Sequence, residues 1–166
     1  TAGILKDQGV NVLLNLFFGP GVNASRGLAG SVSAAVGAFV ANFMTAINPQ
    51  ITKSYACEDR QYMFSLVERG SRFGFYTMML FAVPIILETP AVLSLWLGAY
   101  PDMTVIFVRL VLLNSLLEVL SNTLITLQAA TGKIRNYQIA VGGLLLMNFP
   151  VSYLALKAGA SPMSVY

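Results

Sequence analysis

The first candidates for chemistry are ionisable residues that stand inside long apolar stretches of the chain. Glu118 lies about 14 residues, or roughly 21 Å, into an apolar run over residues 104–130. A charge inside a bilayer costs about 2.5–3.5 kcal/mol on insertion scales, so such a residue usually faces a cavity or a partner. At helical spacing Glu118 shares a face with Asn114, Ser121 and Asn122. This polar face predicts either an interhelical hydrogen-bond seam or the wall of a water-filled cavity.

Arg26 opens another apolar run and is a candidate for binding an anion. From Gly27 to Ile47 the chain has no charged residue, and a span of this kind needs about 20 residues to cross a bilayer core. The helix dipole favours an anion at a helix N-terminus, and a guanidinium adds bidentate recognition of phosphate. The alternative is an ordinary interfacial arginine. Asn42 is a further candidate because it is an amide inside the uncharged run.

Polar residues in the first run of the chain form a third group of candidates. Asp7, Asn11 and Asn15 follow one another at i, i+4 and i+8, and therefore share a helical face. Lys6 is placed to neutralise Asp7, which would otherwise be a charge near the middle of the membrane. Arg109 lies near the outer end of its run, where we expect it to extend to the lipid headgroups.

Composition places these candidates in a membrane protein. Of the 166 residues, 56% are hydrophobic and only 10% are charged, whereas a soluble domain carries roughly 25% charged residues. The single cysteine, Cys57, excludes an internal disulfide, and the absence of histidine excludes a His-ligated metal. We therefore expect no metal, no cofactor and no nucleic-acid partner, and we expect the chain to be a piece of a larger protein.

The apolar runs predict an all-α integral membrane fold with about five transmembrane helices. The first run is too short to cross the bilayer alone unless its helix starts before residue 1. The segment between the second and third runs is rich in charges and aromatics, which is typical of a helix on the membrane surface. The predicted spans are residues 1–18, 24–55, 73–88, 104–130 and 137–157, with interfacial segments at 58–70 and 91–97.

Small residues recur at helical spacing along the second span. One line holds Gly30, Ala34 and Ala38, and another begins at Gly37 and Ala41. Helices in lipid associate through close backbone approach, which small-xxx-small lines permit. We expect these lines to pack closely against neighbouring helices.

The distribution of lysine and arginine predicts the topology. With five alternating spans, the connections over residues 49–72 and 131–136 hold Lys53, Arg60, Arg69, Arg72, Lys133 and Arg135, whereas the opposite side holds only Arg26 and Lys157. Cytoplasmic loops carry the excess of lysine and arginine. The sequence therefore predicts that Cys57 and the turn at residues 131–136 face the cytoplasm.

Three stretches of sequence are similar to a known family. With NLFFGPGVNASRGLAG, INPQITKSYA and LETPAVLSLWLG, the chain resembles the polysaccharide-biosynthesis flippases (O-antigen and lipid-linked oligosaccharide flippases) of the multidrug/oligosaccharidyl-lipid/polysaccharide exporter superfamily. The resemblance covers nearly the whole chain. It implies a bacterial inner-membrane transporter of about 12 to 14 helices in two lobes, of which this chain would be part of one lobe, most similar to the first five helices of the second.

The resemblance also implies a function for the polar residues. Such a transporter moves an undecaprenyl-pyrophosphate-linked oligosaccharide across the membrane by alternating access, without enzymatic chemistry. In a related lipid flippase branch an arginine at the corresponding helix start lines a cationic cavity, and Arg26 matches that position. The acidic residues Asp7 and Glu118 depart from a purely cationic cavity.

Two alternatives remain open at this point. A cation-coupled multidrug exporter of the same superfamily would use Asp7 and Glu118 to titrate or to bind Na+. A membrane glycosyltransferase or polysaccharide polymerase would use carboxylates at the outer face. Glu88 and Asp102 are the only carboxylates in the short outer connections, which argues against the enzyme.

Overall fold

A computed structural model describes residues 2–157 and Pro162, with side chains described from Gln8 onward except at positions 149 and 155. All regular secondary structure in this part of the chain, apart from a single 3-10 residue, is α-helical. The helices are α1 (Ala2–Phe18), α2 (Pro20–Ala56), α3 (Arg60–Leu87), α4 (Thr89–Leu97), α5 (Thr104–Ala130) and α6 (Arg135–Lys157). The predicted all-α membrane fold is confirmed.

Turn chemistry sets where the first helices begin and end. Gly19 alone separates α1 from α2, and its φ of 80° is a conformation that glycine adopts without strain. Pro20 follows as the first residue of α2, where a missing N–H costs nothing. At the far end of α2, the carboxylate of Asp59 accepts a hydrogen bond from the Tyr62 N–H at 3.1 Å and caps the start of α3.

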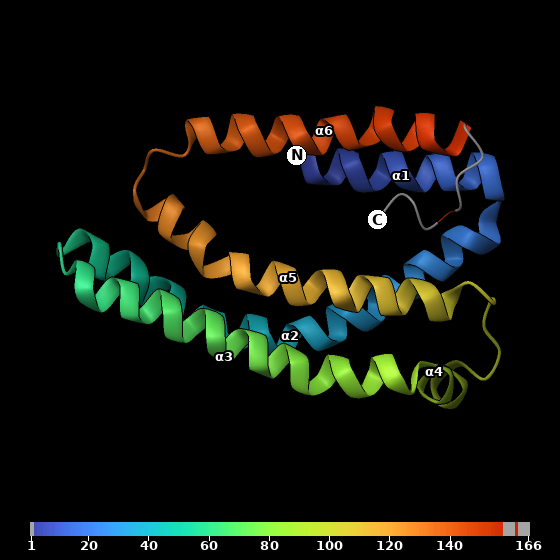
Figure 1. Cartoon of the computed structure of the whole chain (residues 1–166), viewed down its shortest axis with the longest axis horizontal. Helices are drawn as coiled ribbons and strands as arrows, with labels where there is room; N and C mark the ends of the chain where they lie inside the picture. Colours follow the sequence, from blue (N-terminus) through green and yellow to red (C-terminus); the bar gives the residue numbers. More distant parts are fainter. Residues whose placement is uncertain (1, 158–161, 163–166) are drawn as a thin grey trace.

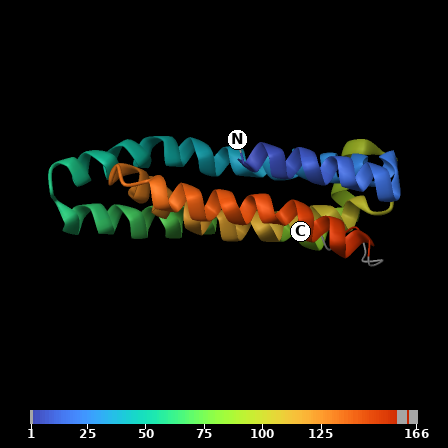
Figure 2. The same ribbon diagram turned by 90° about the horizontal axis from the view of Figure 1, so that it is seen from above.

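The helices form a three-helix bundle and a separate pair. Helices α2, α3 and α5 pack against one another, while α1 packs against α6, as Figure 1 shows. Figure 2, seen from above, places α1 and α6 side by side along the same face of the molecule. The pair joins the bundle at the α1–α2 turn and through the loop that follows α5. Helix α4 is seen almost along its axis in Figure 1, so it crosses the direction of the others.

Two apolar clusters hold these groups together. The bundle core takes one residue per turn from α2, together with apolar residues of α3, α4 and α5. Its fully or nearly fully buried members include Val32, Val36, Val40, Met44, Met78, Ala82, Leu93, Phe107, Val108 and Leu112. A smaller cluster joins α1 to α6 through Val10, Leu13, Leu14 and Leu156. The i, i+4 spacing of the valines gives α2 its buried face.

Close helix approach occurs at glycines of α3 and not along the small-residue lines of α2. A Cβ placed on Gly74 would lie 2.7 Å from Met44 Cε and 3.0 Å from Val119 Cγ1. In contrast, a Cβ at Gly30 would meet nothing within 4 Å, and Ala34 is exposed. The prediction that these lines pack closely is therefore wrong within the described chain. The branched valines of α2 fill the core better than its small residues do.

Four helices are long and apolar enough to cross a membrane: α2, α3, α5 and residues Arg135–Leu154 of α6. The chain is a multi-pass membrane protein. The described apolar part of α1, Gln8–Phe18, is shorter than these spans. The prediction of a separate surface helix over residues 58–70 is wrong, because residues from Arg60 onward are the first turns of α3. The expected short helix at residues 91–97 is present as α4.

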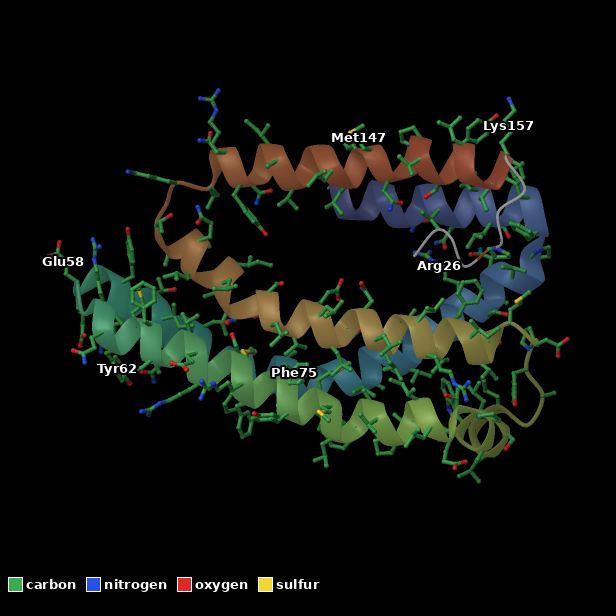
Figure 3. All side chains as sticks on the ribbon, viewed as in Figure 1. Arg26, Glu58, Tyr62, Phe75, Met147 and Lys157 are labelled. Atoms are coloured by element: carbon green, nitrogen blue, oxygen red, sulfur yellow. The ribbon has the colours of Figure 1, made fainter. Side chains whose placement is uncertain are left out.

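The two basic connections lie at the same end of the molecule. Figure 1 shows the α2–α3 turn and the α5–α6 loop at one end, with the α1–α2 turn and α4 at the other. In Figure 3 the labelled Glu58 and Tyr62 mark the first end, and Arg26 and Lys157 mark the second. This grouping agrees with the alternation on which the predicted topology depends.

Candidate functional site

The central feature of the bundle is a cavity between α2 and α5. Its volume is about 210 Å³. The apolar wall is formed by Val40, Met44, Met78 and Val119, and the polar wall by Ser33, Ser115, Glu118 and Asn122, with Gly37 and Ala41 completing the lining. Small residues on α2 leave the space that the polar groups of α5 enter. The cavity can accommodate a small polar or cationic group.

Side-chain hydrogen bonds hold α5 in register with its neighbours. The hydroxyl oxygens of Ser33 and Ser115 lie 2.7 Å apart beside the cavity. Further along, Thr126 donates to the Asn48 side-chain oxygen at 3.1 Å. Ser71 of α3 is hydrogen-bonded to Thr123 of α5. In lipid such bonds between helices replace a hydrophobic driving force. Part of the α5 polar surface is therefore a structural seam.

Glu118 lies on the open side of this seam. Its Oε1 accepts a hydrogen bond from Asn114 Nδ2 at 3.2 Å, one turn earlier on α5. Both side chains are exposed, and so are Ser121 and Asn122. A second hollow of about 410 Å³ runs over Glu118, Ser121 and Asn122 along the helix surface. The predicted polar face of α5 is confirmed. A carboxylate at this depth needs water or a polar ligand in front of it.

Arg26 and Asn11 are brought together from different helices. The guanidinium of Arg26 on α2 donates a short hydrogen bond to the side-chain oxygen of Asn11 on α1. Both residues are half-buried. In Figure 3 Arg26 lies between α1 and α2, in the half of the molecule that holds the turn between these two helices. The bond orients the guanidinium toward α1, and a guanidinium presents its N–H donors in a planar fork. The pair is therefore suited to binding an anionic group.

The other predicted site residues are not gathered at one point. Glu118 lines the cavity beside Gly37, which is about 16 Å along α2 from Arg26. Asn42 is exposed on α2 and does not line the cavity. Lys6 and Asp7 belong to α1, but their side chains lie outside the described residues. The candidate site is thus two separate regions, one around Arg26 and one around Glu118.

Arg109 has a structural role that was not predicted from the sequence. Its Nε donates to the backbone carbonyl of Ile86 at 3.0 Å. That carbonyl would normally accept from the N–H four residues later, but position 90 is proline. The hydroxyl of Thr89 donates mainly to the Ile85 carbonyl at 2.6 Å and lies 3.1 Å from the Ile86 carbonyl. The Arg109 side chain therefore completes the hydrogen bonding at the α3–α4 corner. Its extension to the lipid headgroups stays a prediction.

Four residues of the cavity lining were not predicted from the sequence. Ser33 and Ser115 line the cavity, and Met44 with Met78 forms its apolar wall. A serine inside an apolar helix was the available signal, because such serines often bond across helices. The methionines carried no signal, since methionine is common in any apolar core.

Comparisons with known proteins give no further identification. No family model, no curated protein and no solved structure matches the chain. The assignment of function therefore depends on the geometry described above and on the resemblance noted from the sequence.

Proposed function

We propose that the chain is part of a lobe of a flippase that moves a lipid-linked oligosaccharide across the bacterial inner membrane. The observation that carries the proposal is the open polar face of α5, with the Glu118 carboxylate exposed at the middle of a membrane span. Lipid does not tolerate such a face, whereas a transport pathway requires one. The pathway would be completed by the rest of the protein.

The two regions of the site suit the two parts of an undecaprenyl-pyrophosphate-linked oligosaccharide. Arg26 lies near the end of α2 that we assign to the outside and is bonded to Asn11 of α1. Its guanidinium would pair with the pyrophosphate. Asn114, Ser121 and Asn122 would form hydrogen bonds with sugar hydroxyls as the headgroup passes along α5. Transport by alternating access makes and breaks no covalent bond, so the proposed protein is not an enzyme and needs no cofactor.

A second candidate is a cation-coupled multidrug exporter. It is favoured by one observation, the position of Glu118 beside the 210 Å³ cavity with the hydroxyls of Ser33 and Ser115 close by. A carboxylate and two hydroxyl oxygens are ligands suited to Na+ or to a transported organic cation. The two candidates differ in which charged residue is indispensable.

Export of the lipid-linked glycan in cells lacking the native protein tests the first candidate. Arg26→Ala should abolish export while the protein remains in the membrane, and Arg26→Lys should keep part of it, because lysine supplies the charge without the bidentate fork. Lys157→Ala is the matched control, since this exposed cation lies near the same end. Normal export by Arg26→Ala at equal abundance would overturn the pyrophosphate role.

Glu118→Gln separates the two candidates. Glutamine keeps the size of the side chain and its bond with Asn114 while it removes the charge. Retained glycan export in this variant favours the flippase with a neutral contact to sugar. Reduced export, whose remainder no longer depends on Na+ or on the proton gradient, favours the cation-coupled transporter.

A further inference from the structure

A polar hollow lies at the start of α3, far from the candidate site. It has a volume of about 390 Å³ and is lined by Asp59, Gln61, Tyr62, Ser65 and Arg69. In Figure 3 the labelled Tyr62 marks this end of α3, whereas Arg26 lies at the opposite end of the molecule. The hollow therefore plays no part in the proposed transport site.

The hollow is lined by one cation and one anion. Tyr62, Ser65 and Arg69 follow one face of the helix at i, i+3 and i+7. Arg69 lines the hollow on the side that is further along α3, which agrees with the general tendency of helical side chains to lean toward the start of their helix. Asp59 stands at the outer side, where one carboxylate oxygen caps the Tyr62 N–H at 3.1 Å. Its second oxygen remains an acceptor for another donor.

The length of α3 places the hollow at the depth of the lipid headgroups. The helix has 28 residues and is about 42 Å long, whereas the hydrocarbon core is about 30 Å thick. Counted back from Leu87, the core ends about 20 residues earlier, close to Glu68. The same outward face continues into the core with Phe73, Tyr76 and Leu80, which are all at least half exposed. An acyl chain can lie along that apolar part.

The charges around the hollow select the kind of headgroup. The neighbouring Arg72 is paired with Glu68, with Arg72 Nη2 and Glu68 Oε1 2.5 Å apart, so Arg69 is the guanidinium that the hollow itself contains. A purely anionic headgroup would meet the Asp59 carboxylate at the same place. A zwitterionic headgroup with a primary ammonium satisfies both charges, whereas a trimethylammonium has no N–H to donate.

We propose that this hollow binds one phosphatidylethanolamine molecule of the leaflet on the α2–α3 side, which the charge distribution assigns to the cytoplasm. The phosphate pairs with Arg69 and the ammonium donates to Asp59, while Tyr62 and Gln61 provide further polar contacts. The lipid acts as a ligand at this position and is not transported. The inference does not depend on the proposed function.

Native mass spectrometry of the purified protein in mild detergent tests this assignment. Phosphatidylethanolamine, phosphatidylcholine and phosphatidylglycerol with the same acyl chains are added in turn. We expect phosphatidylethanolamine to bind about fivefold more tightly than the other two, an effect of the size that one exposed ion pair produces. Asp59→Asn should reduce phosphatidylethanolamine to the level of phosphatidylcholine, and Arg69→Gln should weaken the binding of all three.

Two controls separate a loss of lipid binding from a loss of fold or of general surface charge. Asparagine caps helices as well as aspartate does, so Asp59→Asn keeps the fold while it removes the charge. Arg135→Gln removes an exposed cation at the same end, outside the hollow, and should change nothing. Equal binding of phosphatidylethanolamine and phosphatidylcholine would overturn the ammonium contact. Tightest binding of phosphatidylglycerol, or full binding by Arg69→Gln, would overturn the site.

Discussion

Gly74 is the position where the structure makes its sharpest prediction about stability. Here α3 approaches α2 and α5 together, and a methyl group on Gly74 would lie 2.7 Å from Met44 Cε and 3.0 Å from Val119 Cγ1. The Met44 end can move, because methionine is flexible. Val119 cannot move so easily, because its branched side chain has one strongly preferred rotamer in a helix. Gly74→Ala therefore requires the crossing to open.

Two opposing contributions set the change in the free energy of unfolding of Gly74→Ala. Overpacking a well-packed core costs typically about 1–3 kcal/mol. Replacing a helical glycine by alanine contributes about 0.5–1 kcal/mol of stability through backbone entropy. We expect Gly74→Ala to lower the free energy of unfolding by about 1 kcal/mol. Gly30→Ala, where a Cβ meets nothing within 4 Å, should raise it by about 0.5–1 kcal/mol.

Thermal unfolding in detergent measures the difference between the two variants. A change of 1 kcal/mol shifts the melting temperature by about 2–4 °C for a chain of this size. Gly74→Ala should therefore melt below the wild type and Gly30→Ala above it. If Gly74→Ala were as stable as Gly30→Ala, the three-helix crossing described here would be wrong.

Two further predictions concern the α3–α4 corner and the topology. Arg109→Leu should destabilise the protein by about 1.5–3 kcal/mol in denaturant titration, since it leaves the Ile86 carbonyl with less hydrogen bonding, and Arg109→Gln should cost less. Equal stability of both variants and the wild type would contradict this role. The exposed Cys57 should resist a membrane-impermeant thiol reagent in intact cells and react after permeabilisation. Labelling from outside would reverse the orientation.

The sequence was sufficient to predict the helices but not every boundary. Long apolar runs with few charges can only be helices in a membrane, because each backbone polar group must be bonded within its own segment. The charges over residues 58–70 suggested a separate surface helix. They do not break α3, since charged residues are good helix formers and no proline intervenes before Pro84.

The buried face of α2 could not be predicted, because no side of this helix is polar enough to be assigned to the outside of the bundle. Valines and small residues both suit a helix in lipid, so periodicity alone does not say which set is buried. The structure buries Val32, Val36 and Val40 and leaves Gly30 and Ala34 exposed. The deciding factor is the shape of α3, whose Gly70 and Gly74 admit side chains of α2 and α5.

The candidate site could be predicted where polar residues recur at helical spacing along one apolar run. The face that carries Asn114 and Glu118 followed directly from helical spacing, since those residues are one turn apart. The bond between Arg26 and Asn11 joins helices that the sequence pattern cannot orient toward each other. The bond from Arg109 to the Ile86 carbonyl depends on the missing N–H of Pro90, and this effect is visible only once the corner is formed.

The single-residue connection between α1 and α2 has a mechanical consequence. With only Gly19 between two helices, any tilt of α1 must be absorbed by the dihedral angles around one residue. Helix α1 packs against α6, and the Arg26 side chain of α2 ties the middle of α1 to α2 through Asn11. In the proposed transporter, a ligand that competes with Asn11 for the Arg26 guanidinium would remove this bond between α1 and α2. Binding of the anion would then be coupled to the tilt of α1.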